Sequence, residues 1–150
     1  MTSRAAVEGF LGEKTLAVVG VSRGGKKFGN MVMKDLKGKG YRVFPVNPHA
    51  ETIDGEPCYP SLETLPERPG GVITVVPPAV TETVVRDAKA AGIKRIWMQQ
   101  GSESEAALGF CAENGLEVVH GECIMMFAEP VASIHRFHRW IWKLFGKLPR

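Results

Sequence analysis

The 150-residue sequence predicts one α/β domain, a Rossmann-like parallel sheet of about five strands with helices on both faces. Three observations lead to this fold. Short apolar runs rich in valine and isoleucine recur along the chain, as in strands that are buried on both faces of a parallel sheet. Segments with apolar residues at helical spacing separate these runs. Strand and helix therefore alternate, and right-handed crossovers then place helices on both faces.

The first third of the chain contains two predicted helices and two predicted strands. Apolar residues at helical spacing predict a helix over residues 5–11, and the valine-rich run over 15–20 predicts the first strand. The first crossover helix is expected over residues 30–39, where two glycines end the helical pattern. Residues 41–46 form the second predicted strand, which an Asn-Pro pair ends.

The middle of the chain, residues 47–70, is expected to be irregular. It contains Asp54-Gly55 and four prolines from Pro57 to Pro69, which favour turns. One helical turn is expected at residues 61–65, and a buried strand follows over residues 71–76.

The next predicted helix follows Pro77-Pro78 and ends before Gly92. Residues 95–98 then form the fourth predicted strand. The helix is expected to place four apolar residues on one face, namely Val80, Val84, Ala88 and Ala91.

The last predicted helix and strand complete the sheet. The run Ser102-Glu103-Ser104-Glu105 fits a capping box, so a helix is expected to start here and to end at Gly115. Residues 116–119 form the fifth predicted strand.

The candidate binding site is the loop between the first strand and the crossover helix. Its spacing, Gly20-x-Ser22-x-x-Gly25, is that of the dinucleotide fingerprint with serine at the middle position. Glycines let backbone N–H groups approach a phosphate, and the N-terminus of the following helix favours an anion at the same place. In folds of this kind the ligand lies beyond the carboxyl ends of the strands. The loop is therefore predicted to hold the phosphates of a nucleotide-like small molecule.

The residues around this loop indicate which nucleotide to expect. Asn47 stands at the end of the second strand, where NAD-binding domains carry an acid for the ribose hydroxyls, so ordinary NAD binding is disfavoured. Arg23, Lys26 and Lys27 lie on the neighbouring loop. An uncharged acceptor beside basic residues suits an adenosine ligand with extra phosphate, such as coenzyme A (CoA) or NADP. The alternative for at least one of the three basic residues is an ordinary solvated position.

Three other chemistries have weaker support. Residues 20–24 also fit the G-x-S-x-G pattern of serine hydrolases, but the helix is expected to begin several residues late and no earlier strand can supply an oxyanion hole. His120 and Cys123, three residues apart after the last predicted strand, form a conceivable nucleophile pair, although a buried structural cysteine is more frequent. Adding His135 and His138 gives no recognised zinc spacing. No metal site and no catalytic residue are therefore predicted.

Composition limits the classes of partner and compartment. The net charge of +3 is too small to indicate a nucleic-acid partner. No apolar run is long enough to span a bilayer, and the start of the chain lacks the pattern of a signal peptide. The three cysteines form no C-x-x-C pair, and their odd number argues against a disulfide framework. A reducing, cytoplasmic setting is therefore expected.

Residues 130–150 are predicted to form a separate basic amphipathic helix, after a domain that spans residues 1–129. We expect this helix to pack on the domain, on a second copy in a homodimer or on a partner protein. Binding to a membrane surface is the less favoured alternative.

A set of short motifs occurs in order between about residue 14 and residue 126. In chain order they are Val18-Val19-Gly20-Val21-Ser22, Val46-Asn47-Pro48, Ile53-x-Gly55, Tyr59-x-Ser61-Leu62, Leu65-Pro66, Val76-Pro77-Pro78, Ala91-Gly92-Ile93-Lys94, Gln100-Gly101 and Gly121-Glu122-Cys123. This set resembles the stand-alone CoA-binding domain proteins, which are similar to the N-terminal domain of the succinyl-CoA synthetase alpha subunit.

The resemblance implies contacts between CoA and four loops. The resemblance implies that the CoA diphosphate contacts the loop of Gly20, Ser22, Arg23 and Lys27, and that the 3′-phosphate and ribose lie by Asn47 and Pro48. It also implies that the adenine packs on Val76, Pro77 and Pro78, and that the remaining cleft is lined by Gln100 and Gly101. Relatives often carry a lysine after Pro48, where this chain has His49. The resemblance supplies no catalyst, since the phosphohistidine of the ligase family lies in a further domain.

We therefore predict that the chain binds CoA or an acyl-CoA as a binding or regulatory module without its own catalytic machinery. Two alternatives remain. One is an NADP-dependent or acyl-CoA-transforming enzyme that uses Cys123 or His120. The other is an interaction scaffold that acts through the helix over residues 130–150.

Overall fold

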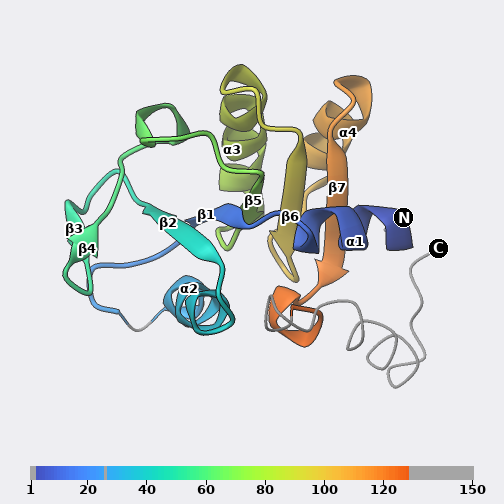
Figure 1. The fold of residues 1–150 in the computed structure, drawn as a ribbon. Coiled ribbons are helices and arrows are strands. Elements are labelled where there is room, and N and C mark those ends of the chain that lie inside the picture. Colours follow the sequence, from blue (N-terminus) through green and yellow to red (C-terminus); the bar gives the residue numbers. More distant parts are fainter. Residues whose placement is uncertain (1–2, 26, 129–150) are drawn as a thin grey trace.

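The computed structural model describes residues 3–25 and 27–128 and confirms the predicted α/β fold (Figure 1). Lys26 and the helix predicted over residues 130–150 lie outside the described residues. In the described part of the chain, no helix is long and apolar enough to cross a membrane.

The described helices are α1 (Arg4–Leu11), α2 (Phe28–Gly38), α3 (Pro78–Ala90) and α4 (Glu105–Glu113). The strands are β1 (Thr15–Val19), β2 (Arg42–Val46), β3 (Thr52–Ile53), β4 (Glu56–Pro57), β5 (Gly71–Thr74), β6 (Arg95–Gln99) and β7 (Glu117–Glu122), and two short 3-10 helices are η1 (Leu62–Thr64) and η2 (Ile124–Met126).

Five of the strands form one parallel sheet in the order β2-β1-β5-β6-β7. β1 pairs with both β2 and β5, so that Val18 lies between Pro45 and Ile73. From β1 the chain goes outward to β2 and then returns across β1 to β5, so the strand order reverses between β1 and β5. In open α/β sheets the ligand crevice lies at such a point, beyond the carboxyl ends of the strands.

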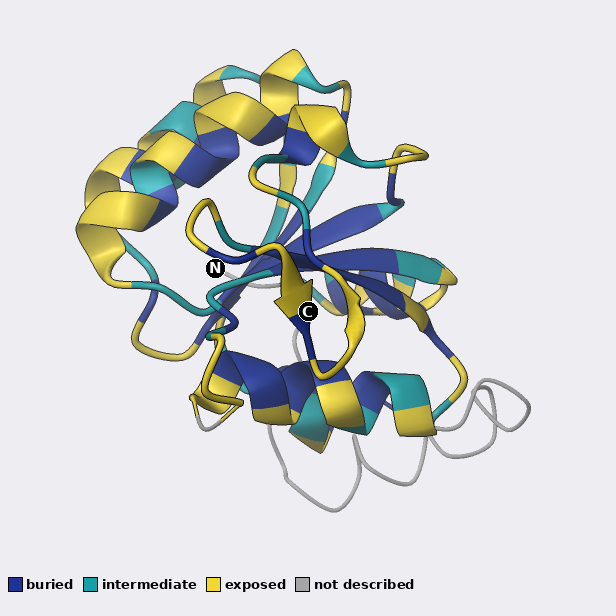
Figure 2. Ribbon diagram, turned by 90° about the vertical axis from the view of Figure 1, so that its left-hand side faces the viewer, coloured by how far each residue is buried: buried dark blue, intermediate teal, exposed yellow. Residues whose placement is uncertain are grey.

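Alternate residues of the central strands pack into two cores, one on each face of the sheet. On β1, Leu16 and Val18 belong to the core under α1 and α2, whereas Ala17 between them belongs to the core under α3 and α4. On β6, Trp97 belongs to the core under α1 and α2, and Ile96 belongs to the core under α3 and α4. Figure 2 shows the helices with their buried side toward the sheet and their exposed side outward. Because both faces are covered, these strands are continuous apolar runs in the sequence.

Trp97 joins three parts of the structure. Its ring is fully buried and lies 5.4 Å from the Phe10 ring of α1 and 6.0 Å from the Phe127 ring after η2. Its indole Nε1–H donates a hydrogen bond to the carbonyl oxygen of Glu122 (3.0 Å). The N-terminal helix and the segment after β7 are therefore fixed to the same face of the sheet.

Residues 47–70 contain a small hairpin that the sequence analysis did not predict. β3 and β4 pair antiparallel around Asp54-Gly55, whose φ angles of 50° and 79° are positive, as a two-residue hairpin turn of this kind requires. Each strand has 2 residues, too few for an alternating pattern to be visible in the sequence. An ion pair between Lys37 and Glu56 holds the hairpin against α2.

Three expectations about the helices were wrong in detail. α2 begins at Phe28, earlier than the expected start near residue 30. The cap of α4 is Ser104, whose Oγ accepts a hydrogen bond from the Ala107 N–H (3.0 Å), and not Ser102. Val80, expected on the apolar face of α3, is 43% exposed, and Thr81 takes the buried position because its hydroxyl has hydrogen-bonding partners there.

We expect Trp97→Phe to lower the free energy of unfolding by roughly 1–3 kcal/mol, because it removes buried ring volume and the Nε1–H hydrogen bond. Urea denaturation followed by circular dichroism measures this change. Val80→Ala, an exposed apolar truncation, should change stability by less than about 0.5 kcal/mol. Equal effects of the two substitutions would contradict the packing of α1 on β6.

Candidate functional site

The residues predicted for the site from the sequence all follow the carboxyl ends of strands of the parallel sheet. They are Gly20, Ser22, Arg23 and Lys27 between β1 and α2, Asn47 and Pro48 after β2, Val76, Pro77 and Pro78 where β5 leads into α3, and Gln100 and Gly101 after β6. Because α2 packs on one face and α3 on the other, the chain diverges between the neighbouring strands β1 and β5. The loops after these two strands border the crevice that the topology opens.

Three backbone segments pack against one another where β1 ends. Gly20 has a φ of +122°, and a Cβ at this position would clash with the carbonyl oxygen of Val75. A Cβ on Gly29, in the first turn of α2, would likewise clash with the carbonyl oxygen of Gly20. Glycine is required at both positions because neither leaves room for a side chain. The N-terminus of α2 is therefore held over the end of β1 and beside the end of β5.

This contact shows which glycine performs the close packing of helix on strand. The fingerprint spacing ends at Gly25, but Gly25 lies in the loop with a φ of +70°, next to the Asp54 carboxylate of the hairpin. Gly29 makes the helix–strand contact instead. The fingerprint missed Gly29 because the loop before α2 is longer than the pattern allows.

Ser22 and Asn30 lock this loop to the first turn of α2. The Asn30 side chain is 4% exposed, and its Oδ1 accepts hydrogen bonds from the backbone N–H (2.8 Å) and the hydroxyl (3.3 Å) of Ser22. Its Nδ2 donates to the carbonyl oxygen of Ser22 (3.0 Å). Asn30 was not among the predicted site residues, although an amide in the first turn of a helix is a recognisable hydrogen-bonding group. The Ser22 N–H is therefore committed to the protein.

Other N–H groups of the same loop remain open. Among the described residues, no acceptor pairs with the backbone N–H of Arg23, Gly24, Phe28 or Gly29. The capping residue of α2, Lys27, makes no side-chain hydrogen bond to the helix end. An uncapped helix N-terminus carries partial positive charge and unsatisfied donors. This arrangement can bind an anion such as a phosphate.

Asn47 connects the loop after β2 to the loop after β1. Its Nδ2 donates to the carbonyl oxygen of Val21 (2.8 Å), and its Oδ1 accepts from the His49 N–H (2.7 Å). Both polar atoms of the Asn47 side chain therefore bind protein groups, and this side chain holds the loops after β1 and β2 together. Pro48 and His49, which follow it, are exposed.

A buried hydroxyl cluster supports the other side of the crevice. The Ser102 Oγ lies 2.7 Å from the Thr74 Oγ1 at the end of β5 and 2.8 Å from the Thr81 Oγ1 in α3. Thr81 also donates to the carbonyl oxygen of Ser102 (2.7 Å). The cluster ties the loop after β6 to β5 and α3, beside the half-buried Val76. Sequence analysis missed it because Ser102 also fits a helix cap.

The two predicted basic residues that the structure describes face solvent. Arg23 and Lys27 are exposed, and neither forms an ion pair within residues 3–25 and 27–128. The exposed Gly101, with a φ of +92°, donates its N–H to the Glu103 carboxylate (3.2 Å) in the turn after β6. Positive charge and open N–H groups thus gather on the β1–α2 loop.

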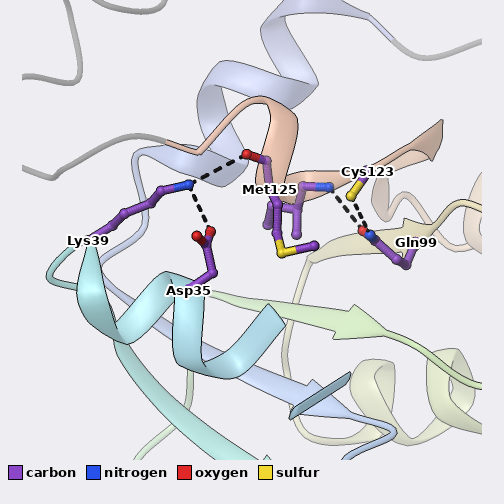
Figure 3. Close-up of polar contacts among 6 residues, drawn as sticks. Asp35, Lys39, Gln99, Cys123 and Met125 are labelled. Carbon is purple, nitrogen blue, oxygen red and sulfur yellow. Dashed lines mark hydrogen bonds and ion pairs between the residues drawn. The ribbon is translucent and has the colours of Figure 1, made fainter. Parts of the chain in front are cut away.

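Cys123, the candidate nucleophile, takes part in a structural contact. The buried Gln99 at the end of β6 donates through Nε2 to the Cys123 Sγ (2.9 Å), and its Oε1 accepts from the Ile124 N–H (3.0 Å) (Figure 3). On the other side of η2, Lys39 pairs with Asp35 (2.7 Å) and donates to the Met125 carbonyl oxygen (3.5 Å). These bonds fix η2 between the sheet and α2.

The structure also places His120 and the other two cysteines. His120 lies inside β7, which extends to Glu122, and so does not follow the last strand as expected. Cys58 and Cys111 are buried free thiols, and burial raises the pKa of both, that of Cys111 to about 11. No group of three or more potential metal ligands occurs in the part of the chain that the structure covers.

Comparison with known proteins gives a consistent set of relatives. The sequence model of the CoA-binding domain matches residues 14–129. The ADP-forming acetate–CoA ligase I of Archaeoglobus fulgidus is 34% identical over 137 residues, which are 84% of this chain and 20% of the ligase. A conserved hypothetical protein from Pyrococcus furiosus has a structure that matches with a TM-score of 0.71 and 42% identity, over 75% of this chain and 97% of that one. The apo form of the acetyl-coenzyme A synthetase 1 of Ca. Korarchaeum cryptofilum matches with a TM-score of 0.60 and 26% identity, over 71% of this chain and 25% of the synthetase.

The lengths of these relatives differ from that of the present chain. The chain spans about a fifth of the Archaeoglobus ligase and a quarter of the Korarchaeum synthetase. The Pyrococcus protein, in contrast, is matched over nearly its whole length. The shared unit is thus one domain, which occurs both within large ligases and in a small protein.

We expect Asn30→Ala to lower the free energy of unfolding by roughly 1–3 kcal/mol, because it leaves the N–H and carbonyl of Ser22 without their partner. Asn30→Asp keeps the acceptor but places a carboxylate oxygen against the Ser22 carbonyl oxygen, so it should destabilise the protein as well. Met31→Ala, at a 55% exposed position on the same turn, is the control. If Asn30→Ala were no more destabilising than Met31→Ala in chemical denaturation, the loop would not depend on this lock.

The raised pKa of Cys111 predicts a pH dependence of stability. In the folded protein the thiol stays protonated to about pH 11, whereas in the unfolded chain it ionises near the ordinary value of 9.0. The unfolded state therefore binds fewer protons in this range, and stability, fully present below pH 9, falls as the pH rises toward 11. Urea denaturation at pH 8 and 10 should show a smaller loss for Cys111→Ala than for the native sequence. Parallel losses in both proteins would contradict the prediction.

Proposed function

The chain belongs to the CoA-binding domain family, and we propose that it binds coenzyme A or an acyl-CoA at the carboxyl ends of its strands. The observation that carries the proposal is the uncapped N-terminus of α2. Its open N–H groups at Phe28 and Gly29 start a helix that packs over the end of β1, and the loop before it adds the open N–H groups of Arg23 and Gly24. Four donors close to a fixed glycine contact suit the diphosphate of CoA.

The other predicted residues take roles around this anchor. Arg23 and Lys27 add positive charge that no protein carboxylate neutralises in the described structure. Pro48 would lie beside the ribose and 3′-phosphate, with Asn47 acting as the residue that positions this loop. The adenine would pack on Val76, Pro77 and Pro78, and Gln100 and Gly101 would line the rest of the cleft.

We propose binding without catalysis by this domain. The Cys123 sulfur accepts a hydrogen bond from a buried amide whose other end holds η2, so we assign this cysteine a structural role. Ligase and synthetase activities are named for relatives in which the matched domain is a fifth to a quarter of the chain. A regulatory or carrier role for bound CoA follows from this proposal, and a reducing, cytoplasmic setting is proposed with it.

Thermal unfolding with matched excesses of CoA, dephospho-CoA, NAD and NADP tests the ligand. At a hundredfold over its dissociation constant, a ligand stabilises the fold by about 2.7 kcal/mol. We expect the largest shift with CoA, a smaller one with dephospho-CoA and none with NAD. Stabilisation by NADP alone would overturn the proposal in favour of the oxidoreductase alternative.

Paired substitutions test the location of the site. We expect Arg23→Ala with Lys27→Ala to weaken CoA binding about tenfold or more in calorimetry, since two cations near the diphosphate are lost. Arg86→Ala with Lys89→Ala removes the same charges from the exposed part of α3 and serves as the matched control. Equal weakening in both double variants would indicate a general charge effect and would contradict binding at the β1–α2 loop.

A further inference from the structure

A second groove lies at the amino-end edge of the sheet, opposite the proposed CoA site. It has a volume of about 740 Å³. Its lining comes from three segments that lead into neighbouring strands, residues 12–15 before β1, 68–70 before β5 and 92–95 before β6. Because these strands are parallel and adjacent, their amino ends and the segments before them meet at one edge.

The charges in this groove are unbalanced. Its acidic lining residue, Glu13, is paired with Arg95 (3.5 Å), which also reaches Glu117 (3.4 Å). The other cations, Lys14, Arg68 and Lys94, are exposed and have no ion-pair partner among the described residues. Lys14, Arg68 and Lys94 therefore place positive charge at the groove outside any ion pair of the described residues, and this exceeds the one negative charge left where Glu13 and Glu117 share Arg95.

Three backbone acceptors at this edge are occupied. The carbonyl oxygens of Lys14, Thr15 and Lys94 accept hydrogen bonds from N–H groups on the neighbouring strands or on the segments leading into them, at 2.9, 2.8 and 2.8 Å respectively. Carbonyl oxygens would repel an anion, and here they are directed into the sheet. These three carbonyl oxygens are thus turned away from a ligand in the groove, while the cationic side chains remain available.

Glycines shape the floor on which the charged side chains lie. Gly92 has a φ of +78°, and the Arg68 Nη1 lies 2.8 Å from the position that a Cβ would occupy there. The Glu13 carboxylate covers the bare backbone of Gly70 in the same way. The guanidinium of the exposed Arg68 therefore lies against the backbone of Gly92.

We propose that this amino-edge groove binds a small multivalent oxyanion, a compound with two or more phosphoryl or carboxylate groups. Arginine and lysine from separate loops can contact different oxygens of such a ligand, and the arginine fork fits either group. Adjacent strands lie about 4.8 Å apart, so the three segments span about 10 Å, which suits a small molecule better than a nucleic-acid duplex. This site is independent of the CoA site and lies at the opposite edge of the sheet.

Nuclear magnetic resonance of the full chain tests the location directly. Inorganic triphosphate and citrate are titrated separately, and the backbone N–H signals of Gly12, Gly70 and Gly92 are followed. We expect saturable shifts at these three glycines with at least one of the two probes, and weaker binding as ionic strength rises. Triphosphate alone would assign a phosphoryl ligand and citrate alone a carboxylate ligand, and both results support the groove.

Variants separate the groove from general electrostatics. Arg68→Ala with Lys94→Ala should raise the dissociation constant measured at these glycines about tenfold or more, because two charge-assisted contacts are lost. The charge-keeping pair Arg68→Lys with Lys94→Arg should retain binding, and Arg86→Ala with Lys89→Ala is the charge-matched control on α3.

Three outcomes would overturn the proposal. The first is an absence of saturable shifts at the groove glycines with both probes. The second is equal weakening in the α3 control, which would mean that net charge alone drives binding. The third is binding of a short RNA at this edge when neither small anion binds, which would assign the groove to a macromolecule.

Discussion

The close approach of three backbones, at Gly29, Gly20 and Val75, is the constraint on which the binding edge depends. It needs glycine at two positions, and it brings the first turn of α2 onto the end of β1. Once the helix is held there, its N-terminal donors cannot be covered by a cap from the loop, because the capping residue is a lysine without a hydrogen bond to the helix. Two amide side chains then fix the surrounding loops, Asn30 through Ser22 and Asn47 through Val21. The packing of α2 on β1 thus leaves the N–H groups at the start of the helix open, and the Asn30 and Asn47 side chains hold the neighbouring loops in place.

The two edges of the parallel sheet present different chemistry for a related reason. At the carboxyl ends, β1, β5 and β6 each lead through a loop into a helix, so backbone N–H groups at helix starts can become available to a ligand. At the amino ends the carbonyl oxygens of Lys14, Thr15 and Lys94 are already used by neighbouring segments. Positive charge at that edge therefore comes from side chains, and Gly92 lets one of them, Arg68, lie against the backbone. An anion is favoured at both edges, by main-chain donors at one and by cationic side chains at the other.

The fold class was predictable because it depends on local patterns that the sheet itself produces. The runs that became β1, β5 and β6 are buried on both faces, so their apolar character was continuous and visible. What the sequence could not show depends on partners far along the chain. Ser102 looks like a helix cap until Thr74 and Thr81 are placed beside it, and Gly29 looks like an ordinary loop glycine until the structure places it against Gly20. The hairpin at Asp54-Gly55 escaped prediction for a different reason, since its strands are too short to produce a period. The location of the candidate site at the strand ends could be predicted from the topology, but the role of each of its residues could not.

The serine in the middle of the Gly20-x-Ser22-x-x-Gly25 spacing holds the loop in place, whereas other residues of the loop keep open N–H groups. A glycine at that point of a dinucleotide fingerprint lets its own backbone meet the phosphates. Here the Ser22 N–H is bound to Asn30, and the Ser22 hydroxyl is directed to the same oxygen, so this residue has given up the role of donor. The open donors follow it in the chain, at Arg23 and Gly24 and at the start of α2. A loop fixed by three hydrogen bonds to one buried side chain loses little conformational freedom when an anion arrives, which lowers the entropic cost of binding. In the proposed complex, the departure from the fingerprint therefore shifts the phosphate contact along the loop, to donors that follow the anchored Ser22, and the proposed site stays at the end of β1.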